Sequence, residues 1–191
     1  LDLGCGKGFL LKRIAKSRKY NCHGFDINQK NQKKENLSFY KKPFNDFKSI
    51  KKINPDIIIL NNFIEHIEDL YDFKKLLNCI AKDSTLIIFT PRSNNLSNLT
   101  FGAYWSGFHA PRHVNIFNKK SFIVFSEFNN FKANVHTIFD PLSLLVSLKN
   151  YLVDLKIKLT LFKVLTGIKI IFFFIFNMLH KSRLIVVCNK N

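Results

Sequence analysis

Cysteine is scarce in this chain of 191 residues, and its four copies are scattered along it. No two of them form a C-x-x-C pair, and none belongs to a Cys/His zinc pattern. The four are Cys5, Cys22, Cys79 and Cys188. This distribution argues against a zinc finger and against a disulfide framework, and the simplest interpretation is reduced thiols in a cytoplasmic protein.

Acidic residues are also few, because 13 Asp and Glu stand against 30 Lys and Arg, for a net charge of +17. This balance favours anionic partners such as nucleic acid, a phosphorylated carrier or anionic lipid. An AT-biased coding sequence would also produce abundant Lys, Asn, Ile and Phe without selection for binding. Both explanations of the charge stay open at this point.

The chain has no long unbroken apolar run. Residues 141–181 are rich in Leu, Ile, Val and Phe, yet their longest such run, Ile170–Phe176, is shorter than the roughly 20 residues that cross a bilayer. Lysines punctuate the segment. We therefore expect a hydrophobic, basic helical insert that lies on an anionic membrane surface, and the alternative is a lid buried on the protein or in a dimer.

The remaining composition is that of one globular domain, since 47% of the residues are hydrophobic and 21 are Phe. We expect residues 1–191 to form a single domain. The chain has no initiator Met and begins inside an apolar strand, so we also expect it to be truncated at its N-terminus, without the helices that would precede this strand.

Glycine is rare too, with seven copies, but three of them stand within the first eight residues. An apolar strand end runs there into D-x-G-x-G-x-G, from Asp2 to Gly8. Such a turn adopts positive φ, lets a ligand approach the backbone and exposes the N–H groups of the next helix. A dinucleotide site has G-x-G-x-x-G, so the early third glycine and the preceding acid favour a cationic ligand, such as S-adenosylmethionine.

With this motif the chain resembles the class I S-adenosylmethionine-dependent methyltransferases. The resemblance implies that the donor turn is formed by Asp2, Gly4, Cys5, Gly6 and Gly8.

A second acid ends the next predicted strand, Cys22–Asp26. Asp26 stands at the spacing where Rossmann-like units bind ribose hydroxyls, with Ile27 beside it, although it could also merely cap the following helix. A third strand is predicted at residues 37–40, and Asp46 in the loop beyond it is a candidate adenine-side contact.

An unbroken apolar run at residues 55–60 predicts a strand buried on both faces of a parallel sheet. The following NNFIEHIED is similar to the segment after the fourth strand of the family. The resemblance implies that Leu60, Asn61 and Asn62 lie beside the donor.

Three later motifs, at residues 90–93, 105–114 and 116–122, resemble a glycan- and quinone-type subset of the family. The resemblance covers about residues 1–140 and 183–190. It implies an α/β fold with a Rossmann-like doubly wound sheet in the order 3-2-1-4-5-7-6, whose last strand is antiparallel and follows the helical insert.

A nucleic-acid substrate is disfavoured, because enzymes that methylate base amino groups place [DNS]-P-P-[YFW] after the fourth strand and this chain has NNFI there. The expected acceptor is a small molecule.

Methyl transfer mostly requires that donor and acceptor are aligned and that water is excluded, but a hydroxyl acceptor also benefits from a base. His66, His109 and His113 are the candidates, although His66 could only brace its helix and His113 could only pin its loop. Some relatives ligate a divalent metal through E-x-x-E-H. Because Asn62 replaces the first acid, no metal is expected.

The sequence thus predicts an S-adenosylmethionine-dependent methyltransferase, and the resemblance implies that its acceptor is a hydroxyl of a sugar, a glycan precursor or a lipid-like molecule. It would work in the cytoplasm, or at the inner face of the membrane. The alternatives are a membrane-associated donor-binding module without catalysis and an NAD-dependent oxidoreductase. The oligomeric state cannot be read from the sequence.

Overall fold

The computed structural model of the chain describes residues 1–154 and 181–190. Most of the predicted insert, residues 155–180, lies outside the described residues. Only its first part, the helix α6 (Pro141–Asp154), is therefore compared with the expectation below.

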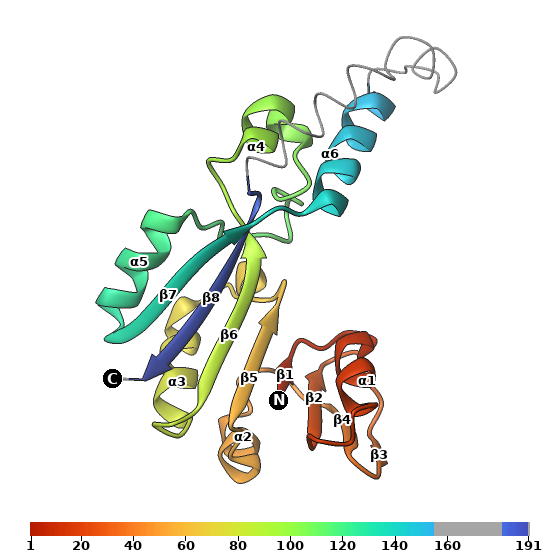
Figure 1. The fold of residues 1–191 in the computed structure, drawn as a ribbon, viewed down its shortest axis with the longest axis vertical. Coiled ribbons are helices and arrows are strands. Elements are labelled where there is room, and N and C mark those ends of the chain that lie inside the picture. The colour runs from red at the N-terminus through yellow and green to blue at the C-terminus, as the bar shows by residue number, and fades with distance from the viewer. Residues whose placement is uncertain (155–180, 191) are drawn as a thin grey trace.

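An eight-stranded sheet forms the centre of the molecule, in the order β3-β4-β2-β1-β5-β6-β8-β7 (Figure 1). Neighbours from β4 to β6 are parallel, and the pairs β3–β4, β6–β8 and β8–β7 are antiparallel. The strands are β1 (Asp2–Leu3), β2 (Cys22–Asp26), β3 (Gln32–Lys34), β4 (Leu37–Lys41), β5 (Ile57–Asn61), β6 (Thr85–Pro91), β7 (Phe131–Ile138) and β8 (Arg183–Lys190).

This order confirms the predicted fold class. With the short edge strand β3 set aside, the seven remaining strands follow the predicted 3-2-1-4-5-7-6 arrangement, and the last strand is antiparallel to both neighbours. The sequence analysis missed β3, whose residues Gln32–Lys34 are all exposed and carry no apolar pattern. It forms only by pairing with β4.

At the start of most described helices, the side chain of the N-cap residue accepts a backbone N–H of the first turn. Asp46, Asp69, Asn95 and Asn118 each accept a backbone N–H at the start of α2, α3, α4 and α5. The helices are α1 (Phe9–Ala15), α2 (Phe47–Ile53), α3 (Leu70–Cys79), α4 (Leu96–Phe101), α5 (Lys119–Phe128) and α6, with short 3₁₀ turns η1 (Ile64–His66) and η2 (Gly102–Tyr104).

Two of these helices have well-defined ends. Helix α5 begins with a capping box between Asn118 and Ser121. Helix α1 ends at Ala15, where the chain turns, and Arg18 takes a left-handed backbone conformation, with φ of 54°.

The main hydrophobic core lies between the sheet and helices α2, α3 and α5. Ile58 and Leu60 of β5 and Leu86 and Ile88 of β6 are completely buried in it. Ile57 of β5 is 41% exposed and Ile59 is half-buried, so β5 is not buried on both faces as predicted. A separate small cluster packs α1 on β2 and β4. A third joins α4, η2 and α6 around Trp105.

The third cluster places α4 and α6 beyond the carboxyl end of β6 (Figure 1). In α/β sheets the carboxyl ends of the strands are where ligands bind. None of the helices in the described part of the chain is long and apolar enough to cross a membrane.

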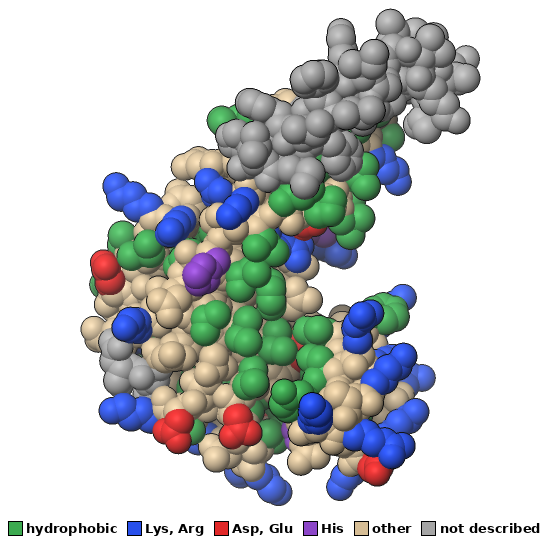
Figure 2. All heavy atoms as spheres, in the orientation of Figure 1, with side chains coloured by type: hydrophobic (Ala, Val, Ile, Leu, Met, Phe, Trp, Pro, Cys, Tyr) green, Lys and Arg blue, Asp and Glu red, His purple; other side chains and the backbone are tan. Residues whose placement is uncertain are grey.

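Lys and Arg side chains crowd the surface over α1, β3 and β4 (Figure 2). The Lys and Arg residues of these three elements are all exposed to solvent. The crowding agrees with both explanations of the net charge, an anionic partner and a biased composition.

Candidate functional site

The glycine turn between β1 and α1 has the conformation that its sequence predicts. Gly4, Gly6 and Gly8 all have positive φ, at 74°, 51° and 71°. A Cβ on Gly4 would lie 2.0 Å from the ring of Phe63, whereas one on Gly6 would meet nothing within 4 Å. Gly4 is therefore required by packing, while the space at Gly6 is open to a ligand.

Asp26 ties the end of β2 to this turn. One of its carboxylate oxygens accepts the backbone N–H of Gly6 at 2.9 Å, and the other accepts that of Asn28 at 2.8 Å. Gln29 completes the link by donating to the carbonyl of Gly6 at 2.8 Å. The acid therefore shapes the turn itself, besides any contact with a ligand.

Asp2 is the second acid at the turn, and it is buried. Only 3% of the residue is exposed, and its Oδ1 has no hydrogen-bond partner in the described structure. Burial raises the pKa of Asp2 to about 7, with the charge of Asp26 adding to the rise and the N-terminal ammonium opposing it. A buried carboxylate without a partner is costly unless a cation approaches it.

A cavity of about 440 Å³ opens beside the turn. Three of the predicted donor residues line it: Gly4, Asp26 and Ile27. Its wall also includes Phe44 and Phe63, whose rings meet edge to face with centroids 5.3 Å apart. The sequence analysis missed these two aromatic residues as site residues.

Other predicted donor residues have different surroundings. Asp46 does not line the cavity: it caps α2 through the N–H of Ser49 and pairs with Lys42 at 2.5 Å. Leu60 is completely buried in β5, so its side chain is not available to a ligand.

The last glycine of the turn has a packing role, because a Cβ on Gly8 would lie 2.3 Å from the ring of Phe39. Cys5 and Asn61 are half-buried and line neither cavity.

A second cavity, of about 330 Å³, gathers the predicted acceptor-side residues. Asn62, His66, His109 and His113 all line it, and His66 also lines the first cavity. The two hollows therefore adjoin at His66. This arrangement suits a reaction between two bound molecules.

The ring of His113 contacts the rings of both other histidines. The rings of His66 and His113 meet with centroids 4.7 Å apart, and those of His109 and His113 at 5.1 Å. Burial lowers the pKa of both His109 and His113, and the nearby basic groups lower it further, although the hydrogen bond to Gly107 opposes the shift at His113. Both rings are therefore neutral at physiological pH.

Backbone carbonyls fix the orientation of two of these rings. Nδ1 of His66 lies 2.9 Å from the carbonyl oxygen of Arg112, and Nδ1 of His113 lies 2.7 Å from that of Gly107. A carbonyl only accepts, so each Nδ1 carries a proton, and in the neutral form of each ring the lone pair is therefore on Nε2.

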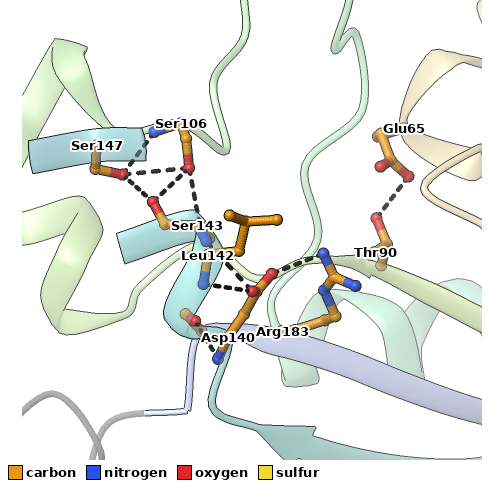
Figure 3. Close-up of polar contacts among 9 residues, drawn as sticks. Glu65, Thr90, Ser106, Asp140, Leu142, Ser143, Ser147 and Arg183 are labelled. Carbon is orange, nitrogen blue, oxygen red and sulfur yellow. Dashed lines mark hydrogen bonds and ion pairs between the residues drawn. The ribbon is translucent and has the colours of Figure 1, made fainter. Parts of the chain in front are cut away.

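Glu65 is completely buried and lies beside Thr90 of β6 (Figure 3). Its Oε2 accepts the hydroxyl of Thr90 at 3.0 Å, while its Oε1 has no partner among the described residues. Its backbone carbonyl accepts the N–H groups of Val114 and Asn115. These bonds join η1 to the loop that carries His113.

Helix α6 forms the opposite wall of the second cavity. Asp140 accepts the N–H groups of Leu142 and Ser143 at the start of α6 and pairs with Arg183 of β8 at 2.6 Å (Figure 3). Ser106, Ser143 and Ser147 hydrogen-bond with one another and so join α6 to the loop after η2. The start of the predicted insert is thus part of the site, which the sequence analysis did not foresee.

A family described as "Methyltransferase domain" matches residues 1–137 of the chain. A search among curated proteins finds no match.

Solved structures share the fold at low sequence identity. The plantazolicin methyltransferase BpumL, in complex with a triazolic desmethylPZN analog and SAH, is 14% identical, with a TM-score of 0.58 over 100% of this chain and 75% of that one. A cyclopropane-fatty-acyl-phospholipid synthase-like protein from Lactobacillus casei is 11% identical, with a TM-score of 0.60 over 98% and 82%. The 1,6-didemethyltoxoflavin-N1-methyltransferase of Burkholderia thailandensis is 12% identical, with a TM-score of 0.58 over 100% and 69%; it was crystallised with its substrate and S-adenosylhomocysteine.

Proposed function

The chain belongs to the family of methyltransferase domains, and from this premise we propose that it moves a methyl group from S-adenosylmethionine to a hydroxyl of a small molecule. The observation that carries the donor assignment is the unpartnered, buried Oδ1 of Asp2 beside a glycine turn.

The residues of the turn fit this donor. Asp2 offers a carboxylate to a cationic group, and the space at Gly6 is open to a ligand that approaches the backbone. Asp26 lines the cavity and offers carboxylate oxygens to ribose hydroxyls, while Phe44 and Phe63 supply apolar surface for an adenine ring. A dinucleotide would bring phosphates toward these two acids, which disfavours NAD.

When bound, the donor supplies a methyl group on a positively charged sulfur. The chain has to hold the acceptor in line with this group and keep water away. The second cavity is suited to the acceptor because it adjoins the first at His66 and has α6 as its far wall.

His113, His109 and His66 are the proposed catalytic side chains. A neutral imidazole with a free Nε2 takes up the proton that an acceptor hydroxyl loses as it is methylated. At His66 and His113 Nδ1 donates to a backbone carbonyl, so Nε2 carries the lone pair in the neutral tautomer.

The proposed acceptor is a sugar, a glycan precursor or a lipid-like molecule. The cavity supports this choice because it joins polar groups, such as Ser106 and His109, to the apolar side chains of Leu142 and Val146 on α6. Leu142 and Val146 also reach solvent, at 69% and 40% exposure. We therefore also propose that α6 brings the domain to the inner face of an anionic membrane, where an amphiphilic acceptor would be held.

The donor assignment is tested by calorimetric titration of the protein with S-adenosylhomocysteine and, separately, with NAD. We expect S-adenosylhomocysteine to bind and NAD not to bind. Binding of NAD instead would contradict the donor assignment.

Catalysis is tested with labelled S-adenosylmethionine and a panel of sugars, glycan precursors and lipid-linked acceptors. Once an acceptor is found, His113→Ala is expected to lower turnover at least tenfold and to leave donor affinity unchanged, because the lost side chain lies on the acceptor side. The control is His136→Ala, since His136 is an exposed residue of β7. An equal loss of melting temperature and donor binding in His113→Ala would show that this histidine only supports the loop.

A further inference from the structure

Glu65, His66 and His113 bring three ligand atoms together at the second cavity. One carboxylate oxygen and one ring nitrogen from each histidine all lie within 4.8 Å of one another. Glu65 and His66 are neighbours in η1, whereas His113 arrives from a loop 47 positions later, held there by the bonds of Val114 and Asn115 to the carbonyl of Glu65. The backbone therefore builds this juxtaposition.

Both imidazoles are oriented as metal ligands usually are. In metal sites, the second ring nitrogen of a ligating histidine donates to a carbonyl or a carboxylate, which fixes the tautomer. Arg112 and Gly107 provide such carbonyls for His66 and His113. In the neutral form of each ring, Nε2 is therefore the nitrogen that can bind a metal ion.

Glu65 supplies the second, independent indication. The residue is 0% exposed, and its Oε1 is left without a hydrogen bond in the described structure while Oε2 is held by Thr90. Arg183 acts electrostatically on Glu65 but is already paired with Asp140. A cation bound at the free oxygen would stabilise this buried carboxylate.

We propose that Glu65, His66 and His113 bind one divalent first-row transition metal ion of the Zn²⁺ type. Two imidazole nitrogens and one carboxylate oxygen form a ligand set that prefers such ions to Mg²⁺ or Ca²⁺, which favour oxygen ligands. Zinc ligands lie about 2.0–2.2 Å from the ion, so the three atoms draw together slightly on binding.

This proposal departs from the expectation that no metal binds, which rested on Asn62 in place of an acid. Glu65 and His66 are the last two residues of that E-x-x-E-H pattern, and the structure brings His113 to them from a distant loop. With Asn62 in place of the first acid, the ligand set has one acid and two histidines, and so fewer oxygen ligands than a site with two acids.

The bound ion would keep an open side, because all three ligands line the cavity. A metal with three protein ligands and an open position can bind a hydroxyl oxygen and lower its pKa. In this arrangement His109, the third histidine of the cavity, is left to accept the proton. This role in the reaction rests on the proposed function, whereas the binding of the ion does not.

The test is a titration of the full chain, freed of metal with a chelator, in the absence of donor and acceptor. Zn²⁺ binding is followed by calorimetry, Co²⁺ binding by visible absorption, and Mg²⁺ serves as the comparison. We expect one Zn²⁺ per chain and no Mg²⁺ binding at the same concentrations. Glu65→Gln, His66→Ala and His113→Ala should each weaken Zn²⁺ binding at least tenfold.

Two histidine variants serve as controls. His109→Ala removes an imidazole from the same cavity that is outside the ligand set, and His136→Ala removes an exposed one on β7. Both should bind Zn²⁺ like the parent protein. Glu65→Gln keeps the size of the side chain and an oxygen for the hydroxyl of Thr90, so it is the variant that best preserves the fold.

Equal Zn²⁺ affinity in the parent and in the three ligand variants would overturn the proposal, as would absence of binding to the parent. Since S-adenosylhomocysteine binding is measured separately on every variant, a loss of folding is recognised, and the result stays independent of methyl transfer.

Discussion

The carboxylate of Asp26 accepts the backbone N–H of Gly6 at 2.9 Å, across 20 residues of sequence, and so joins the carboxyl end of β2 to the turn after β1. Its other oxygen accepts the N–H of Asn28. The same side chain lines the cavity beside the turn. One acid therefore both shapes the proposed donor site and faces the ligand.

Replacement of Asp26 by Ala is expected to weaken S-adenosylmethionine binding more than tenfold, or about 1.4 kcal/mol, because the ribose hydroxyls and the turn lose a charged acceptor. Asp26→Asn keeps one acceptor oxygen and should lose less. Calorimetry measures both. The control is Asp83→Ala, an exposed acid in the turn before β6. Unchanged affinity in Asp26→Ala would exclude Asp26 from the site.

Donor affinity should depend on pH through Asp2. Burial, assisted by the charge of Asp26 and opposed by the N-terminal ammonium, raises the pKa of this carboxyl to about 7. Below this pH the side chain is protonated and neutral, and above it the side chain is charged and attracts the donor's ammonium group. Affinity for S-adenosylhomocysteine should therefore rise about tenfold from pH 6 to pH 8. In Asp2→Asn this rise should disappear, and a rise of the same size there would assign the titration to another group.

The two first glycines of the turn should respond differently to substitution. Gly4→Ala forces a Cβ against the ring of Phe63 and should lower the free energy of unfolding, visible as a lower melting temperature. Gly6→Val has room for its Cβ, so we expect a smaller loss of stability from the positive φ alone, about 1–2 kcal/mol, but a loss of donor binding. Thermal melts and calorimetry separate the two effects. A Gly6→Val variant that folds and binds the donor would place the donor elsewhere.

The central strands could be predicted because each carries its own local signal, whereas their order was implied by the resemblance to the methyltransferase family. The apolar run of β5 and the acid that ends β2 are both visible in the sequence. By contrast, β3 has three exposed polar residues and exists only through its pairing with β4. No local pattern contains this information.

The site was less predictable because it also depends on contacts between segments that are distant in the sequence. Glycines and acids stand in fixed motifs, but the position of Phe63 against Gly4 depends on how η1 packs on the turn. Asp46 is an acid in a loop, and the sequence does not distinguish a ligand contact from the helix cap that the structure shows. The meeting of Glu65 with His113 results from backbone bonds between η1 and a distant loop.

The last prediction concerns helix α6 and lipid. Leu142, Val146, Lys149 and Val153 repeat at helical spacing, and all four are exposed, so they form an apolar stripe with one lysine. Such a stripe suits a helix that lies in a membrane surface. In flotation assays we expect the protein to bind vesicles that contain anionic lipid, to bind neutral vesicles less, and to dissociate in high salt as the lysine attraction is screened.

Val153→Glu tests this stripe directly, because Val153 is 68% exposed and does not line the second cavity. The variant places a negative charge against the anionic surface and should lose most vesicle binding. Its affinity for S-adenosylhomocysteine should stay unchanged, because the glycine turn lies between β1 and α1 and not on α6. Val124→Glu is the matched control, because Val124 is a similarly exposed valine on α5 and should bind vesicles like the parent. Equal loss in both variants would indicate a general effect of net charge. A parent protein that does not float with anionic vesicles would contradict the membrane proposal and leave α6 only as the wall of the second cavity.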